Sequence, residues 1–195
     1  MFEYRSALAG WARADGGPAA VSGPQLRIAE IRDWRLAQLT AWRGAREEFT
    51  RSVAAAFGGA LPESLCRGTT LGGSRLIRLT RDQYWWIDAH DAGFERLRSG
   101  FDPACGAFTD LSDARVRLAI SGSAARELLA AGIALDLHPD VFAIGQSAQT
   151  GLHHTGVLLE RVAADAYELF VPRTFAATIW EFLVDAALPH GVKPA

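Results

Sequence analysis

The chain has 195 residues, of which 49% are hydrophobic and 22% charged, and its formal net charge is −2 with a pI near 6.2. This composition is typical of an ordinary soluble globular protein and fits one large or two small domains. The small net charge gives no electrostatic reason to expect a nucleic acid or an anionic membrane as a partner. No apolar run approaches the roughly 20 residues that span a bilayer, and the opening residues MFEYR lack the features of an export signal, so we expect a cytoplasmic protein.

Residues 1–24 are predicted to form an extended N-terminal arm. Gly16-Gly17-Pro18 and Ser22-Gly23-Pro24 interrupt any periodic pattern. The arm nevertheless carries large apolar side chains, which a disordered segment usually lacks: Phe2, Tyr4, Leu8 and Trp11. We therefore expect the arm to be held against a surface, either of its own domain or of a partner.

The first half of the remaining chain, about residues 34–100, is predicted to run strand, helix, hairpin, helix. Its first helix is indicated by Phe49, Val53 and Phe57, which share one face at helical spacing. A strand at 26–31 precedes this half. The predicted elements of the half are, in order, a strand at 36–42, a helix after Gly44 that ends at Gly58-Gly59, a loop with Pro62, Cys66 and Gly72-Gly73, a hairpin of strands 75–79 and 83–88 around 80–82, and a short helix around Phe94 and Leu97 that ends near Gly100.

The second half, about residues 108–190, repeats that order. Val116, Leu118 and Ile120 alternate with smaller or charged residues, which predicts a strand with one buried face. The further elements are a helix over Ala125–Gly132 that Ser123 would cap, a hairpin of strands 155–162 and 167–171 joined by 163–165, and a last helix from Thr174 with Phe175, Ile179, Phe182 and Leu183 as its apolar stripe.

Corresponding landmarks in the two halves are separated by about 80 residues, as a duplicated unit would give. Each half alone would leave a sheet face and its edges unsatisfied. We therefore predict an α+β fold in which two pseudo-repeated strand-helix-hairpin-helix halves pack as one domain, residues 25–190.

No pattern in the sequence predicts a metal site. His153 and His154 are expected on a strand, where neighbouring side chains point to opposite faces and cannot close on one metal ion. No metal-ligand spacing links this pair to the remaining histidines, His90, His138 and His190. Cys66 and Cys105 form no C-x-x-C pair; one disulfide is conceivable, but two free thiols are favoured.

Catalytic motifs are also missing from the sequence. Asp110 and Asp113 could divide acid and base roles, but their place before a strand favours turn and cap acceptors. Arg115 and Arg117 are interpreted as a solvated strand face rather than an anion site. The chain has no nucleophile elbow, no Walker loop and no dinucleotide fingerprint after a strand. We predict no catalytic, cofactor-binding or metal-binding residue.

Tryptophan is frequent for a chain of this length, with 6 residues. Aromatic side chains also anchor protein interfaces, so we do not assign all of them to the core: Trp11, Trp34, Trp42, Trp85, Trp86 and Trp180.

The folate-binding glycine-cleavage T-protein superfamily has a strand-to-helix signature that this chain resembles at Asp110-Leu111-Ser112, Arg115, Gly122, Ala125 and Leu128-Leu129. The hairpin signature of that superfamily is similar to His154-Thr155-Gly156, Tyr167-Glu168-Leu169 and Pro172. Over roughly residues 105–188 the chain resembles the gamma subunits of heterotetrameric sarcosine oxidases more closely. The residues that carry this resemblance are Leu135-Asp136-Leu137-His138-Pro139, Phe142, Gly145-Gln146 and Gly151–Val157.

This resemblance implies the fold of the folate-binding T-protein domain and an assembly with alpha, beta and delta subunits as partners. Such an assembly oxidatively demethylates sarcosine to glycine with hydrogen peroxide and passes the one-carbon unit to tetrahydrofolate when it is present. The family implies FAD, FMN, NAD, zinc and tetrahydrofolate for the partner subunits, and no cofactor or catalytic residue for the gamma chain.

The chain departs from the folate-using relatives at Val157. Those relatives carry an acidic residue directly after the Thr-Gly of the hairpin, where a carboxylate accepts hydrogen bonds from pterin amino groups. An isopropyl group accepts none, and unpaired donors cost about 1–3 kcal/mol or more. We therefore expect that this chain no longer binds folate.

The leading hypothesis is a non-catalytic gamma subunit of sarcosine oxidase, part of an oxidoreductase complex, which self-associates or is poorly soluble when isolated. The alternative is a free-standing tetrahydrofolate-binding one-carbon transferase or regulator of the same fold. A third hypothesis, an unrelated α+β interaction module, remains if the motif match is accidental. Titration with tetrahydrofolate distinguishes the first two.

Overall fold

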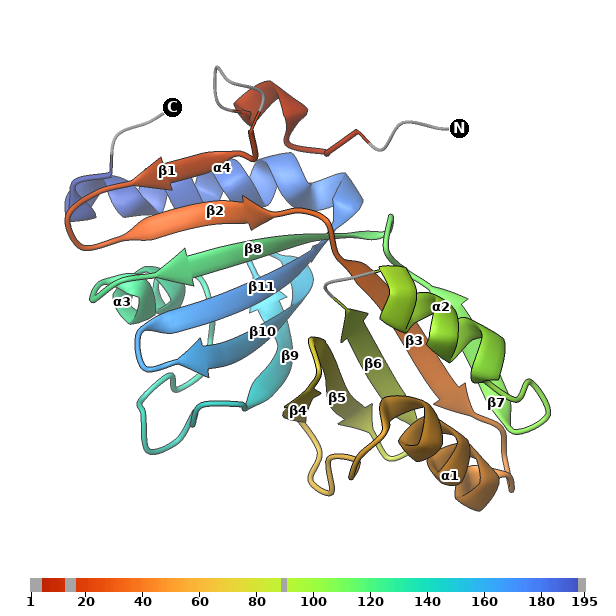
Figure 1. Ribbon diagram of the computed structural model, residues 1–195. Helices are drawn as coiled ribbons and strands as arrows, with labels where there is room; N and C mark the ends of the chain where they lie inside the picture. The colour runs from red at the N-terminus through yellow and green to blue at the C-terminus, as the bar shows by residue number, and fades with distance from the viewer. Residues whose placement is uncertain (1–4, 13–16, 89–90, 193–195) are drawn as a thin grey trace. The chain divides into compact units, whose positions relative to one another are not determined.

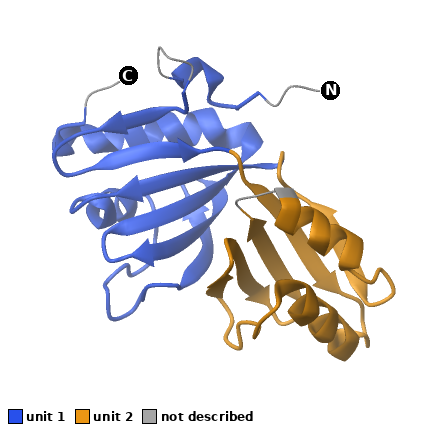
Figure 2. Ribbon diagram, viewed as in Figure 1, with its two compact units in different colours: residues 1–32, 114–195 blue, residues 33–113 orange. Residues whose placement is uncertain are grey.

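The protein is described by a computed structural model that covers residues 5–12, 17–88 and 91–192. The chain divides into two compact units (Figure 2): unit 1 combines residues 1–32 with 114–195, and unit 2 comprises residues 33–113. Each unit holds one antiparallel sheet with helices on it (Figure 1). The described residues thus form a mixed α/β fold with two antiparallel sheets and four α-helices.

Unit 1 contains a 6-stranded sheet in the order β1-β2-β8-β11-β10-β9. Its strands are β1 (Ala20–Ser22), β2 (Arg27–Ile31), β8 (Arg115–Ser121), β9 (Ser147–Leu152), β10 (Thr155–Ala163) and β11 (Ala166–Pro172). Its helices are α3 (Ala125–Ala130), α4 (Ala176–Ala187) and the 3-10 turns η1 (Ala9–Trp11), η2 (Arg173–Phe175) and η3 (Leu188–His190).

The core of unit 1 lies between this sheet and α4, which runs along one face of the sheet (Figure 1). Val116, Leu118 and Ile120 bury the face of β8 that the alternation predicted. From α4, Ile179, Trp180 and Leu183 enter the same cluster. Each fully buried side chain of this size contributes about 1.5–3 kcal/mol, so this layer is the main source of stability of the unit.

The described part of the N-terminal arm belongs to unit 1. Leu8 is fully buried in its core, and Val21 of β1 pairs with Ile28 of β2. The buried carboxylate of Glu30 accepts hydrogen bonds from the Ser6 hydroxyl and the Arg32 guanidinium. The described part of the arm is therefore held against its own unit, which is one of the two surfaces that the sequence analysis proposed. Phe2 and Tyr4 lie outside the described residues.

Unit 2 contains a 5-stranded sheet in the order β4-β5-β6-β3-β7. Its elements are β3 (Arg35–Ala41), α1 (Arg46–Phe57), β4 (Arg67–Leu71), β5 (Ser74–Thr80), β6 (Gln83–Asp88), α2 (Asp91–Gly100) and β7 (Gly106–Asp110). Both helices cover the same face of the sheet (Figure 1), over an aromatic core in which the rings of Phe57 and Trp86 form a T-shaped pair with centroids 5.4 Å apart. Gly58 ends α1 at φ 77°, which confirms the predicted stop.

Several predicted boundaries were wrong. Ser123 and Thr174 cap no helix, because neither α3 nor α4 has a side-chain cap hydrogen bond and α4 begins only at Ala176, after the turn η2. Phe175 is 48% exposed and lies outside the apolar stripe. The predicted loop around Cys66 contains the strand β4, whose mostly exposed residues carry no alternating pattern.

Candidate functional site

The β9–β10 hairpin carries the His153-His154 pair, and the sequence interpretation of this pair was wrong. Both residues form the turn between the paired Leu152 and Thr155, not a strand. Their φ angles are 44° and 65°, the left-handed conformation that both central residues of a type I′ turn require. The His153 ring stacks on Phe182 of α4 at 4.9 Å between centroids, with 22° between the ring planes.

This turn closes a shallow hollow of about 400 Å³ against α4, which His153, Thr178, Glu181, Phe182, Asp185 and Ala186 line. Its polar groups come from one helix face and the turn. Within the described part of the chain, no group of three or more His, Cys, Asp or Glu side chains is placed to hold a metal ion.

Val157 follows the turn on β10 and lies in the core of unit 1. Its side chain is 5% exposed and belongs to the cluster that includes Leu152, Leu159 and residues of α4. The position after Thr155-Gly156 therefore faces apolar side chains under the helix. A carboxylate in this place would lose its water and gain no charged partner from the cluster, which is energetically unfavourable.

The opposite face of β8 carries a charge pair that the sequence interpretation missed. Arg117 was expected to be solvated, but its side chain is only 13% exposed. It donates from Nε and Nη2 to the Glu168 carboxylate of β11, at 3.0 and 2.8 Å. The Arg117 guanidinium also lies 5.8 Å from the centroid of the Phe170 ring. Burial lowers the pKa of the neighbouring Arg115 from its ordinary value.

Asp110 and Asp113 are both exposed and do not form a catalytic pair in a cleft. An Asp110 carboxylate oxygen accepts the Ser112 backbone N–H at 2.9 Å, a turn role. The Ser112 hydroxyl in turn accepts the N–H of Leu36 at 3.0 Å, and the Leu111 N–H donates to the Leu36 carbonyl. The motif thus ties the end of β7 to the start of β3.

The two cysteines are free thiols. Cys105 is buried, and its thiol lies 3.0 Å from the carbonyl oxygen of Asp102. Burial, and secondarily the charge of Asp102, raises the pKa of the Cys105 thiol above its usual value. The thiol therefore stays protonated and is a poor nucleophile at neutral pH. Cys66 is partly exposed at the start of β4.

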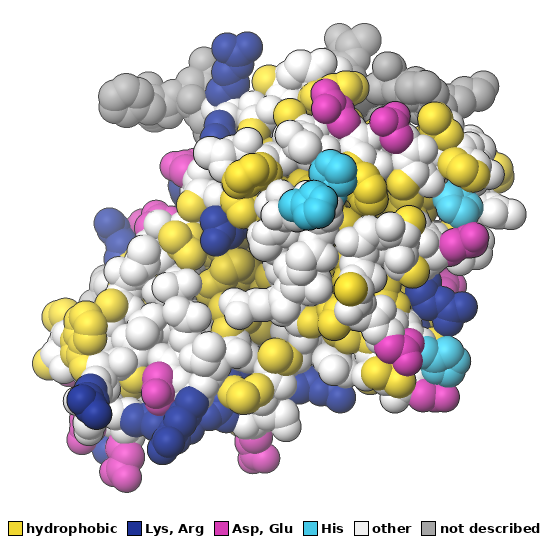
Figure 3. All heavy atoms as spheres, turned by 180° about the vertical axis from the view of Figure 1, so that it is seen from behind, with side chains coloured by type: hydrophobic (Ala, Val, Ile, Leu, Met, Phe, Trp, Pro, Cys, Tyr) yellow, Lys and Arg dark blue, Asp and Glu magenta, His cyan; other side chains and the backbone are white. Residues whose placement is uncertain are grey.

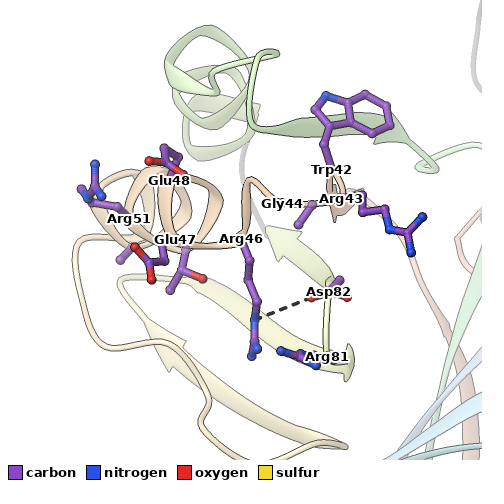
Figure 4. A pocket seen from close by; sticks show the side chains of 12 residues that line it. Trp42, Arg43, Gly44, Arg46, Glu47, Glu48, Arg51, Arg81 and Asp82 are labelled. Carbon is purple, nitrogen blue, oxygen red and sulfur yellow. Dashed lines mark ion pairs between the residues drawn. The ribbon is translucent and has the colours of Figure 1, made fainter.

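Unit 2 has an open groove of about 1240 Å³ at the turn from β3 into α1 (Figure 4). Trp42, half exposed, is fixed because its indole N–H donates to the Pro103 carbonyl at 2.9 Å. The lining is mainly charged and exposed, with Arg46 and Asp82 3.6 Å apart. The sequence analysis assigned Trp42 to a strand and missed this groove; Gly44, which has a φ of 87° just before α1, is the residue in the sequence that marks a turn here. The groove could contact a polar ligand, but its lining pairs no nucleophile with a buried base.

The sequence matches the model of the GCVT N-terminal domain over residues 66–195. This match covers more than half of the chain, so the chain belongs to the GCVT N-terminal domain family. It has the fold of the folate-binding superfamily around that domain, as the sequence resemblance predicted.

The fold is similar to a chain of the heterotetrameric sarcosine oxidase from Corynebacterium sp. U-96, a structure in complex with pyrrole 2-carboxylate. The two share 25% sequence identity and a TM-score of 0.81, over 95% of each chain. The glycine cleavage system aminomethyltransferase T from Bartonella henselae shares the fold at 18% identity and a TM-score of 0.60, over 80% of this chain and 44% of that one. A comparison with curated proteins found no match.

Proposed function

We propose that the chain is the gamma subunit of a heterotetrameric sarcosine oxidase and is not catalytic by itself. In this role it supports the oxidative demethylation of sarcosine to glycine with hydrogen peroxide and the transfer of the one-carbon unit to tetrahydrofolate. The observation that carries the proposal is the similarity to a sarcosine oxidase chain over 95% of both chains. Because nearly all of both chains align, this chain is better explained as the equivalent of that sarcosine oxidase chain. The aminomethyltransferase, in contrast, has more than half of its length outside the match.

The chemistry of the described residues supports a non-catalytic role. Burial is the main cause of the shifted pKa values of Cys105, Arg115 and Tyr167, and none of these three residues lines the groove at α1 or the hollow at α4. Catalytic groups usually have pKa values shifted by specific charged neighbours inside a cleft. The burial of Val157 in the apolar core supports the inference that this chain has lost the acidic residue with which folate-using relatives bind the pterin.

The partners in this proposal are the alpha, beta and delta subunits, and the complex is cytoplasmic. FAD, FMN, NAD, zinc and tetrahydrofolate would be held by those subunits. Among the described residues of this chain, no helix combines the length and the apolar character needed to cross a membrane.

We also infer that the two halves of the chain arose by duplication and pack as one domain. Support comes from the sheets: the neighbouring strands β4-β5-β6-β3 in unit 2 have the same order as β9-β10-β11-β8 in unit 1. Each first strand of a half, β3 or β8, is followed by a positive-φ glycine and a helix: Gly44 before α1 and Gly122 before α3. One cooperative melting transition by calorimetry would support a single domain, and two separate transitions would contradict it.

Co-expression tests the proposed function. The chain, carrying an affinity tag, is produced together with the sarcosine oxidase alpha, beta and delta subunits from its own source. We expect the eluted protein to contain a flavoprotein and to oxidise sarcosine, with no turnover by the chain alone. A monodisperse monomer that retains no flavoprotein would contradict the proposal. Micromolar binding of tetrahydrofolate by the isolated chain would favour a free-standing folate-dependent transferase or regulator instead.

A further inference from the structure

The open groove at the turn from β3 into α1 contains four arginines against three carboxylates. Arg46 is the first residue of α1, and in Figure 4 its side chain points toward the β5–β6 turn, which carries Arg81 and Asp82. The other two carboxylates, of Glu47 and Glu48, lie farther along α1 in this view. On the face of the molecule in Figure 3, charges of both signs are interspersed, which is the usual pattern of a solvated surface. The arginines beside Asp82 depart from that pattern.

Three arginines of the groove are poorly neutralised by the described residues. Arg43, which lines the groove just before the helix, and Arg81 form no ion pair with any described residue. Arg46 Nε lies 3.6 Å from an Asp82 carboxylate oxygen, and the two side chains are 41% and 52% exposed. Because an exposed ion pair contributes little to stability, an incoming anion can replace Asp82 as the partner of Arg46. The groove thus offers guanidinium groups to a bound anion.

Trp42 gives the same groove an aromatic face. Its side chain is half exposed, and its indole N–H donates to the Pro103 carbonyl at 2.9 Å, which holds the ring in one orientation. Gly44 lies between Trp42 and Arg46 in Figure 4, and no atom beyond its chain neighbours lies within 4 Å of the position that a Cβ would take there. Open space, and not a side chain, therefore lies between the ring and the helix start. A fixed, half-exposed ring is suited to stacking on a planar ligand.

The arginines and the aromatic ring together suit one class of ligand. Guanidinium groups recognise phosphate, whose oxygens accept their N–H hydrogen bonds, often two at a time. Planar heterocyclic rings stack on aromatic side chains. The groove has a volume of about 1240 Å³, more than the roughly 300–1,000 Å³ of most small-molecule sites, so it has room for a ligand that carries both a phosphate and a ring.

We propose that this groove binds a nucleoside monophosphate or a compound of the same form, with a planar ring joined to one phosphate. Arg46 and Arg81 hold the phosphate, and the ring stacks on Trp42. Arg43 adds positive charge that attracts the ligand to the groove. All four residues belong to unit 2, so the inference concerns this chain alone and does not rest on its assembly with larger subunits.

The test is isothermal titration calorimetry of the full chain at low salt, with adenosine monophosphate as the probe and with adenosine and inorganic phosphate as partial ligands. One variant combines Arg46→Gln with Arg81→Gln, and the other is Trp42→Ala. The matched controls are Arg96→Gln, at an exposed position on α2 of the same unit, and Phe175→Ala, because Phe175 is 48% exposed and Trp42 50%. Thermal melting of each variant checks that the fold is retained.

We expect one molecule of adenosine monophosphate to bind per chain, with an affinity that falls as salt is added. The double arginine variant should weaken this binding at least about tenfold and Trp42→Ala at least about fivefold, whereas both controls leave it unchanged. Adenosine and inorganic phosphate should each bind at least about tenfold more weakly than the complete nucleotide, because each lacks one of the two contacts.

Absence of nucleotide binding by the folded, unmodified chain would overturn the inference, and so would equal losses in the controls. Inorganic phosphate that binds as tightly as the nucleotide would show an adventitious ion only and would overturn it as well. If the arginine variant does not fold, competition on the unmodified chain decides: excess inorganic phosphate should displace the nucleotide, and a nucleotide that stays bound would contradict the site. None of these results changes the proposed function, which co-expression tests separately.

Discussion

The Arg117–Glu168 pair gives the sharpest prediction about stability. Glu168→Ala removes the carboxylate that two Arg117 donors contact at 2.8 and 3.0 Å, in a place where the two side chains are only 13% and 11% exposed. Breaking a buried ion pair on one side costs about 3–5 kcal/mol, and the residual exposure to water places this pair at the lower end, about 3 kcal/mol. For a chain of this size the melting temperature should fall by about 6–12 °C.

The chain supplies a matched control. Arg98 and Glu95 on α2 form a pair with the same 2.8 Å distance, but their side chains are 62% and 55% exposed. Glu95→Ala should therefore cost only about 0.5 kcal/mol. A double replacement, Arg117→Met with Glu168→Leu, should recover most of the loss, because it leaves no unpaired buried charge.

Urea unfolding, followed by tryptophan fluorescence, measures the free energy of unfolding of the parent, of Glu168→Ala, of Glu95→Ala and of the double replacement. The expected order of stability is the parent and Glu95→Ala together, the double replacement close to them, and Glu168→Ala well below. The reasoning is refuted if Glu168→Ala and Glu95→Ala cost the same, or if the double replacement is as unstable as the single one.

Three further predictions follow from the fold. Leu8→Ala should destabilise the protein by about 2–4 kcal/mol in urea unfolding, because Leu8 is fully buried in the core of unit 1; a negligible change would mean that the arm contributes no packing. Gly122→Ala should lower stability by about 2 kcal/mol or more, since φ is 116° and the new Cβ would collide with the Gln25 carbonyl oxygen, whereas Gly156→Ala, with open space around the Cβ, serves as its control. Burial raises the pKa values of Cys105 and Tyr167 above their ordinary 9.0 and 10.0. As the pH rises, the unfolded chain therefore releases these protons before the folded protein does. Their contribution to stability is complete below the ordinary pKa values and is lost as the pH rises through the raised pKa values of the folded state. The free energy of unfolding should therefore fall as the pH rises above about 9, and less so in Cys105→Ala; a flat profile would contradict the burial of both groups.

Local sequence patterns predicted the elements that bury one face against a single layer of the core. The alternation in β8 and the helical spacing of Phe49, Val53 and Phe57 in α1 each report burial against one layer, and both elements were confirmed. Short strands without such a face escaped prediction. β1 and β4 have 3 and 5 residues, and their register is set by pairing with β2 and β5, which no local pattern records.

The candidate site was harder to predict, because its features depend on contacts between distant residues. Arg117 and Glu168 are 51 residues apart in the sequence, and the alternation that places Arg117 opposite the helix-covered core does not reveal its acidic neighbour. The His153-His154 turn was missed because glycine, asparagine and aspartate are the usual residues at positive φ, and a histidine pair gives no such signal. The family resemblance, by contrast, rests on short motifs that the sequence itself displays, and the match over residues 66–195 confirmed it.

The central claim is that the chain is a non-catalytic member of a flavoprotein assembly. Native mass spectrometry of the material purified through a tag on this chain, after co-expression with the alpha, beta and delta subunits, tests it most directly. We predict a complex in which one copy of the chain, without a bound folate, accompanies flavin-containing subunits. Detection of the chain as a monomer with tetrahydrofolate bound and without a protein partner would contradict the account.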